Sequence, residues 1–146
     1  MFIDRVLPAA RKRLVTVGID ASLLEAARLL SGPSDLVVVC ASDGHLKGVV
    51  TKTDIVRQIG RYQSSSCQLA ISSVMTRNPI ICRPTDGLHD VWSLMKARRL
   101  KNVPVTDAES VPIGVLNARD ALEALMVEVE QEETLLRDYV MSVGYR

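Results

Sequence analysis

The sequence contains few aromatic residues, no long apolar run and no excess of charge of either sign. Aromatic residues make up 3% of the 146 positions, so any core must be built from aliphatic side chains. No apolar run reaches the roughly 18 residues that a membrane-spanning helix needs, and we expect no signal peptide at the start. Lysine and arginine total 18 against 17 aspartates and glutamates, which argues against a generally basic nucleic-acid-binding protein.

Cysteine and histidine are also scarce. Cys40, Cys67 and Cys82 are far apart and form no Cys-x-x-Cys pair, so we expect free thiols in a cytoplasmic protein. Without ligand spacing, these thiols and the two histidines argue against a structural zinc site, and we expect no metal. His45 and His89 have no nucleophile beside them in a catalytic pattern and are interpreted as structural. The motifs of phosphate-binding loops, dinucleotide folds and zinc proteases are all missing.

What the sequence does have is an internal repeat. The segment Leu46–Val56 recurs as Pro112–Leu122, at an offset of 66 positions that also relates Asp54 to Asp120. Self-similarity at a fixed offset indicates a duplicated structural unit. We therefore expect two copies of one unit of roughly 60 residues.

Each copy reads as strand, helix, strand, strand, helix, which predicts an α/β fold. In the first copy the elements are strand Leu14–Val17, a helix through Leu23 to Leu30, strands Leu36–Cys40 and Leu46–Val50, and a helix starting at Asp54–Ile59. In the second copy they are strand Ile80–Cys82, helix Leu88–Met95, strands Val103–Thr106 and Ile113–Leu116, and a helix from Ala118 onward.

The predicted domains are residues 12–60 and 74–126, joined by a linker at 61–73 that includes the serine run 64–66. The segment before them, Phe2–Arg13, is amphipathic at best and broken by Pro8. After them, residues 127–146 continue as an additional C-terminal helix. This helix is interpreted as a packing or dimerisation helix, or alternatively as a solvated helix of its own domain.

Three short motifs resemble those of the CBS domain (cystathionine β-synthase domain). They are Gly48–Asp54, which resembles the family's nucleotide-binding signature, Val74–Pro79, and Asn102–Asp107, and the resemblance extends over roughly residues 12–126. It implies two pseudo-symmetric units packed through their sheets, known as a Bateman module, which often pairs into a flat disc and so implies a homodimer. The ligands it implies are AMP, ADP or ATP, and less often S-adenosylmethionine or NAD.

The residues themselves suit a nucleotide. Asp54 and Asp120 are expected in the first turn of a helix, where the helix dipole favours an ionised acid that can accept hydrogen bonds from both ribose hydroxyls. Thr51 lies at the preceding strand-to-helix turn, and Gly48 and Gly114 permit a close approach of backbone or ligand. The alternative interpretation of Thr51 and Asp54 is a simple helix N-cap with a dipole-complementing acid.

In the family, the site of one unit is completed by the other unit. The resemblance thus implies a stronger nucleotide site made of Thr51, Lys52, Asp54, Ile81, Lys101 and Asn102. The neighbouring cations Arg98, Arg99 and Lys101 can attract a phosphate. They can equally be a solvated helix end whose charge complements the dipole.

The second site is expected to be weaker. Its members would be Val15, Asp35, Leu36, Asn117 and Asp120. Asn117 replaces the Ser or Thr of the family pattern, and the carboxylate of Asp35 would repel a phosphate, an effect that Arg119 can offset. We expect this site to be weaker, empty or selective for an uncharged group.

The predicted function is that of a regulatory, non-enzymatic nucleotide sensor acting on an unidentified effector protein. One alternative is a ligand-free structural or interaction module; another is an enzyme using Lys101 or His45, which lacks a metal-carboxylate cluster or a paired nucleophile and base. Binding of nucleic acid through Arg11–Arg13 and Arg98–Lys101 is disfavoured because aromatic stacking residues are missing from both segments. The nucleotide, the effector and the dimer geometry stay open.

Overall fold

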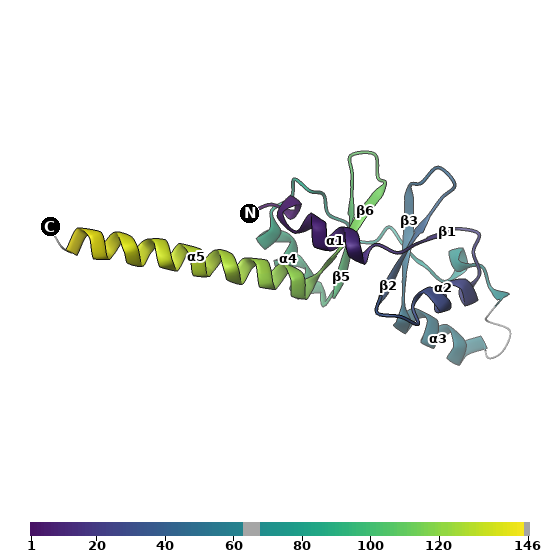
Figure 1. Ribbon diagram of the computed structural model, residues 1–146. Coiled ribbons are helices and arrows are strands. Elements are labelled where there is room, and N and C mark those ends of the chain that lie inside the picture. The colour runs from purple at the N-terminus through teal and green to yellow at the C-terminus, as the bar shows by residue number, and fades with distance from the viewer. Residues whose placement is uncertain (63–67, 145–146) are drawn as a thin grey trace.

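The computed structural model describes residues 1–62 and 68–144 (Figure 1). The serine run 64–66 of the predicted linker lies outside the described residues. Of the linker's remaining residues, Ile71–Ser73 form a short 3-10 turn. None of the helices in the two described ranges combines the length and the apolar character that a membrane span requires.

The first unit contains a four-stranded sheet with two helices. Its elements are β1 (Thr16–Gly18), α2 (Leu23–Leu29), β2 (Leu36–Cys40), β3 (Leu46–Thr51) and α3 (Lys52–Tyr62). The strand order is β1-β2-β3-β4, in which β1 and β2 are parallel and the short β4 (Thr76–Arg77) is contributed by the chain that leads into the second unit. Strand β1 lies about two residues later than expected, and α3 begins at Lys52 rather than at Asp54.

The second unit repeats this plan. It contains α4 (Leu88–Arg98), β5 (Asn102–Thr106), β6 (Pro112–Asn117) and α5 (Ala118–Gly144). The antiparallel pairs β2–β3 and β5–β6 have the same register and each a bulge at equivalent positions, between Val39 and Cys40 and between Val105 and Thr106. This shared irregularity is strong structural evidence for the duplication.

The predicted strand Ile80–Cys82 is shorter than expected. Only Cys82 pairs with the second unit's hairpin, as a parallel bridge to Val105. The Cys82 amide donates to the carbonyl of Pro104 at 3.0 Å, and the Thr106 amide donates to the carbonyl of Cys82 at 2.9 Å. The chain therefore follows the path of β1 in the first unit but forms one bridge instead of a strand.

The N-terminal segment Phe2–Arg13 is helical over most of its length, and, contrary to the expectation from the sequence, Pro8 does not break it. It forms a 3-10 turn, η1 (Ile3–Val6), and helix α1 (Leu7–Arg13). Pro8 does not break α1 because it lies in the first turn, where a proline's missing amide is not needed for helical bonding. Ile3, Val6 and Ala10 are buried in the core of the second unit. The sequence interpretation was wrong because this order comes from packing against residues far along the chain.

The two units exchange their leading segments. The N-terminal segment packs on the second unit, where the Ile3 amide donates to the carbonyl of Asp86 at 2.9 Å. Conversely, Ile71 and Met75, which precede the second unit, are buried in the core of the first. Figure 1 shows α1 beside β6, and α2 and α3 beside the other sheet.

A third apolar cluster lies between the units. It consists of Leu36, Val38 and Val49 from the first unit and Val115 from the second. In β2 the alternate residues Val37 and Val39 face the helices of their own unit instead. Strand β2 is therefore buried on both faces, which explains its continuous apolar sequence.

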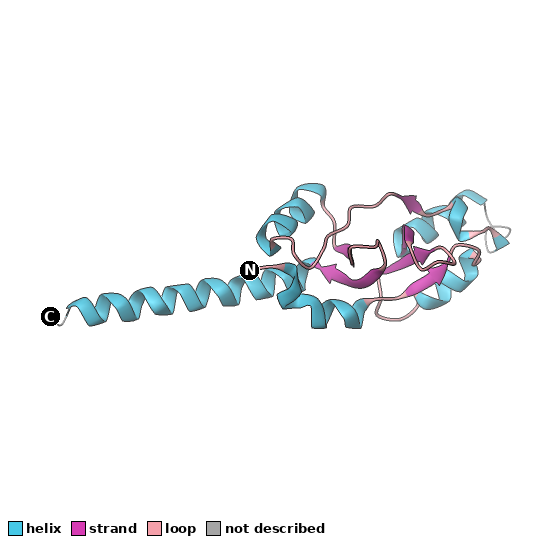
Figure 2. Ribbon diagram, turned by 90° about the horizontal axis from the view of Figure 1, so that it is seen from above, coloured by secondary structure: helices cyan, strands magenta, loops and turns pink. Residues whose placement is uncertain are grey.

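Helix α5 is much longer than its unit requires. Its 27 residues correspond to about 40 Å at 1.5 Å per residue. Its first turns pack on the second unit through buried Ala121 and Leu125. The remainder projects away from both units, as Figures 1 and 2 show from two directions.

Candidate functional site

A cavity of about 720 Å³ opens between the two units. Its lining from the first unit includes Thr51 and Asp54, at the junction where β3 ends and α3 begins. The second unit contributes Arg99 and Lys101, which follow α4, and Asn102, the first residue of β5. Residues from distant parts of the chain thus enclose one space, as the duplicated pattern predicts.

Thr51 and Asp54 bond to each other in a reciprocal cap at the start of α3. The Asp54 amide donates to Thr51 Oγ1 at 3.2 Å, and the Thr51 amide donates to Asp54 Oδ2 at 2.9 Å. This is the geometry of a capping box, with an acid at the third helical position. The side chain of Asp54 is 19% exposed, and its Oδ1 lies 3.7 Å from Arg57 Nη1. Thr51 and Asp54 therefore do form the helix N-cap of the alternative interpretation, and the Asp54 carboxylate also borders the cavity.

Lys52 lines the cavity but its charge is engaged within the first unit. Its ammonium lies 3.4 Å from Asp35 Oδ1 and donates to the carbonyl of Gly32 at 3.2 Å. The expected repulsion between Asp35 and a phosphate is thereby reduced. Lys52 is held by these neighbours beside the cavity.

The cations from the second unit are not engaged in this way. Within residues 1–62 and 68–144, no carboxylate lies within ion-pair distance of Arg99 or Lys101. Arg99 ends α4 in the left-handed conformation, with φ of 56°. Arg98, which the sequence grouped with them, does not line the cavity. Two of the three expected cations therefore face the space that Asp54 borders.

The cavity differs from the expected set at several positions. Ile81 is not part of the lining and is 36% exposed, whereas its neighbours Pro79 and Ile80 do line it. Thr76 and Asn78 also border the cavity, although the sequence assigned them no role. Asn78 has a positive φ of 49°, which asparagine tolerates better than most residues. The Asn-Pro dipeptide was the available signal for a turn at this point.

The equivalent region around Asp120 is arranged differently. Arg13 of α1 binds the Asp120 carboxylate with two bonds, from Nε to Oδ2 at 2.6 Å and from Nη2 to Oδ1 at 3.1 Å. This bidentate pairing raises the pKa of Arg13 above its ordinary value, so the guanidinium stays charged. The carboxylate that would accept a ribose is thus occupied by a side chain of the same molecule.

The other members of the expected second site do not converge either. Asn117 Oδ1 accepts from the Arg119 amide at 3.0 Å and its Nδ2 donates to Asn102 Oδ1 at 3.0 Å, so both ends of its side chain are used. Val15 packs against the first unit's core. Only Asp35 and Leu36 of that set line the adjacent cavity.

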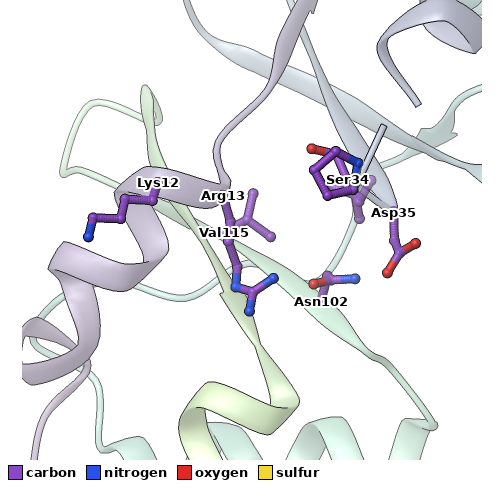
Figure 3. A pocket seen from close by; sticks show the side chains of 8 residues that line it. Lys12, Arg13, Ser34, Asp35, Asn102 and Val115 are labelled. Atoms are coloured by element: carbon purple, nitrogen blue, oxygen red, sulfur yellow. The ribbon is translucent and has the colours of Figure 1, made fainter. Parts of the chain in front are cut away.

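That second cavity is small, about 160 Å³. Figure 3 shows Arg13, Asp35 and Asn102 around it, while Lys12 points away from them. Neither Asn117 nor Asp120 belongs to its lining. The two halves of the molecule therefore differ more than the sequence alone indicates, because Arg13 lies far from Asp120 in the chain.

The two described thiols and the two imidazoles are absent from the lining of the large cavity. Burial raises the pKa of the Cys82 thiol to about 12, as expected for an unreactive core cysteine. His45 lies in a turn with its Nδ1 3.2 Å from Asp43 Oδ2. Trp92 packs against the core of the second unit, with Lys96 Nζ 5.4 Å from the centre of the Trp92 ring. None of these residues lines the cavity at Asp54.

Comparison with known proteins agrees with this architecture. The sequence matches the CBS domain family twice, over residues 6–61 and 71–127. The chain belongs to the CBS-domain family. The matched ranges are wider than the predicted units 12–60 and 74–126, and the first includes all of α1.

Solved CBS-domain proteins have the same fold. A CBS-domain containing protein from Agrobacterium tumefaciens is 29% identical, with a TM-score of 0.74 over 84% of this chain and 92% of that one. CBSX2, solved in complex with AMP, is 22% identical, with a TM-score of 0.73 over 86% of this chain and 96% of that one. The CBS domain pair of MJ0100, solved with 5′-methylthioadenosine and S-adenosyl-L-methionine, has the same TM-score of 0.73 at 22% identity, over 88% of this chain and 98% of that one.

Some curated relatives are much larger enzymes. Homoserine O-acetyltransferase of Methanosphaera stadtmanae is 28% identical over 75% of this chain, but the match spans only 22% of that protein. Arabinose 5-phosphate isomerase of Escherichia coli is 30% identical over 77% of this chain and 33% of its own length. The CBS pair is thus one part of these longer proteins.

Proposed function

We propose that this chain is a regulatory module that binds an adenine nucleotide in the large cavity between its two CBS units. The composition of that cavity carries the proposal. The first unit supplies the carboxylate of Asp54 at a helix start, and the second supplies Arg99 and Lys101 without a carboxylate partner among the described residues. A ribose acceptor and phosphate-binding cations therefore line one space, and its volume of about 720 Å³ lies within the range of small-molecule sites.

Each part of the nucleotide has a matching part of the lining. Asp54 and the Thr51 hydroxyl are suited to the ribose, Arg99 and Lys101 to the phosphate, and apolar side chains such as Ile80 to the adenine ring. AMP is the first expected ligand, followed by ADP and ATP, with S-adenosylmethionine or NAD less favoured. The adenosine group shared by the ligands of CBSX2 and MJ0100 supports this order.

We expect one nucleotide per chain rather than two. The support is the bidentate pairing of Arg13 with Asp120, which engages both oxygens of that carboxylate and so makes it a poorer acceptor for a ribose. In contrast, the partners of the Asp54 carboxylate among the described residues are a backbone amide and the more distant Arg57. The stronger and weaker sites expected from the sequence thus acquire a physical cause.

The module would act by changing its shape for a partner. A ligand that contacts both units stabilises the arrangement in which they enclose it, by as much as its affinities for the two arrangements differ. We infer that an effector protein reads this difference, that the module works as a homodimer without catalysing a reaction, and that it acts in the cytoplasm. A ligand-free scaffold is the outcome that the following experiment would reveal.

Titration calorimetry with AMP tests the site through a matched pair of variants. Asp54→Asn keeps an oxygen for the Thr51 amide but loses the charge, so AMP affinity should fall about tenfold or more. Asp120→Asn changes the equivalent residue and should leave AMP affinity unchanged. Equal effects of the two substitutions, or no binding of any of the five ligands by the wild-type chain, would refute the proposal.

A second matched pair of variants tests the part of the site that would bind the phosphate. Lys101→Met should weaken AMP binding by about tenfold while leaving adenosine binding unchanged, because only AMP carries the phosphate charge. Arg98→Met removes a neighbouring cation that does not line the cavity, so it should leave both affinities unchanged. Loss of adenosine binding in Lys101→Met would place Lys101 elsewhere in the site.

A further inference from the structure

The projecting part of α5 carries an uncovered apolar stripe, which we call the tail stripe. It consists of Met126, Val129, Leu136 and Val140, whose side chains are between 56% and 64% exposed. Apart from half-buried Glu128, every residue from Met126 to Ser142 is exposed, so no other part of the described chain covers this helix. Most of a helix's stability in a protein comes from packing of its apolar face, and the projecting part of α5 has no such packing among the described residues.

The spacing of the tail stripe is that of a two-helix seam. Its members are separated by three, seven and four residues, and Glu133 occupies the remaining position of the repeat. Alternating intervals of three and four place side chains at the a and d positions of a heptad, where helices of a coiled coil meet. The stripe is therefore shaped to receive another helix along its length.

The charges on α5 select the partner and its direction. Four glutamates occur between positions 128 and 133, whereas Arg137 is the one cation from residue 126 to residue 144. Parallel pairing of two identical helices would align the acidic segments and place Glu133 opposite Glu133 of the partner subunit. Antiparallel pairing places the acidic segment of one helix beside residues 136–141 of the other, which are apolar apart from Arg137 and Asp138.

We propose that the tail stripe binds the tail stripe of a second copy of this chain in an antiparallel helix pair. Centring the pair between residues 134 and 135 sets Val129 against the partner's Val140. It also sets Glu130 beside the partner's Arg137, because e positions face e positions in antiparallel coiled coils. The pairing is two-fold symmetric, so every contact occurs twice.

Each half of this pair contains one polar layer, so the two-fold symmetry gives two such layers, adjacent at the centre of the seam. Glu133 would face the partner's Leu136, where a lone charge is unfavourable. Its carboxylate lies 3.1 Å from Arg137 Nη2 of the same helix, which keeps it paired at the edge of the seam. The layers thus weaken the dimer but do not leave an isolated charge in it, and the dimer is expected to be modest in affinity.

The first test is the mass of the full chain in solution, by sedimentation velocity at several concentrations. The wild-type protein should be a dimer at micromolar concentration, and Leu136→Asp/Val140→Asp should be a monomer. Both side chains are more than half exposed and neither lines the large cavity, so AMP binding should match that of the wild type, and any loss of helical circular dichroism should be confined to the tail. A monomeric wild type, or a double variant that stays dimeric, would overturn the proposal without touching the nucleotide site.

The second test distinguishes an antiparallel from a parallel pair of helices. Arg137→Glu should weaken the dimer about tenfold, because two opposite-charge contacts become like-charge contacts. Adding Glu130→Arg should restore it in the antiparallel pair. In a parallel pair the facing residue would be Glu132, so Glu132→Arg/Arg137→Glu is the matched control and should stay weak. Rescue by Glu132→Arg instead of Glu130→Arg would overturn the antiparallel arrangement.

Discussion

Asp54 and Asp120 occupy equivalent positions 66 residues apart, yet their carboxylates have different neighbours. Asp54 bonds to the amide of Thr51 and borders the large cavity. Asp120 is bound by Arg13, an ordered residue only because α1 packs on the second unit. Arg13, on a segment that precedes both units, thus adds a structural difference between the two aspartates to the sequence differences at Asn117 and Asp35.

Removing Arg13 should therefore open the second site. We expect Arg13→Ala to bind a second AMP per chain in titration calorimetry, more weakly than the first because Asn117 and Asp35 remain. The cost in stability should be small, about 0.2–1 kcal/mol, since the Arg13 side chain is 41% exposed. Arg11→Ala, on the same helix, is the control and should keep one site. A single site in Arg13→Ala would mean that Arg13 is not what closes the second one.

For single residues, the sequence predicted which side chains line the large cavity better than it predicted which side chains pair with one another. Six residues were expected to converge, and five of them line the cavity while Ile81 does not; the five are Thr51, Lys52, Asp54, Lys101 and Asn102. The cavity joins the turn between β3 and α3 of the first unit to the segment between α4 and β5 of the second, whereas the equivalent turn at Asn117–Asp120 does not line it. The Arg13–Asp120 pair joins residues 107 positions apart. No local pattern reports such a pairing, so it required the structure.

Among the elements, α1 and β6 show how closely the exchanged segments pack. A Cβ atom on Gly114 of β6 would lie 2.9 Å from the Ala10 backbone, and one on Gly48 of β3 would lie 2.7 Å from the carbonyl oxygen of Thr76. The two glycines thus admit backbone from the other unit's leading segment. The sequence left open whether backbone or ligand would approach them, and the structure shows backbone.

Gly114→Ala should consequently destabilise the protein. The added methyl group must displace α1 from the sheet, at a cost of about 1–3 kcal/mol, measured as the free energy of unfolding in urea. Gly60→Ala should instead raise the free energy of unfolding, because nothing lies within 4 Å of a Cβ at this position in α3 and alanine favours the helix. A Gly114→Ala variant as stable as the wild type would show that α1 can shift away from the sheet without lowering the free energy of unfolding.

The elements with a local signal were predicted well. The continuous apolar runs of β2 and β5 and the turn residues after them identified both hairpins, including their equivalence. Helix α1 was missed because its three buried residues, Ile3, Val6 and Ala10, gain order only from the distant second unit. The bridge at Cys82 was expected to be a full strand because its apolar neighbours resemble one.

For the whole molecule, the two units meet through few buried side chains. The cluster between them contains Leu36, Val38, Val49 and Val115. The large cavity lies at the same boundary and draws its lining from both sides. A bound nucleotide would therefore add contacts where the units have few of their own, and this is the place where occupancy can alter their packing.

Ligand binding should accordingly stabilise the entire chain. At a concentration 100 times its Kd, AMP adds about 2.7 kcal/mol to the free energy of unfolding. For a domain near 150 residues this corresponds to a rise in Tm of about 5–11 °C. The wild type and Asp120→Asn should both show the rise at one AMP concentration, and Asp54→Asn should show much less. No rise with AMP, ADP, ATP, S-adenosylmethionine or NAD would favour a scaffold, because a ligand that bridges the units cannot bind the folded chain without stabilising it.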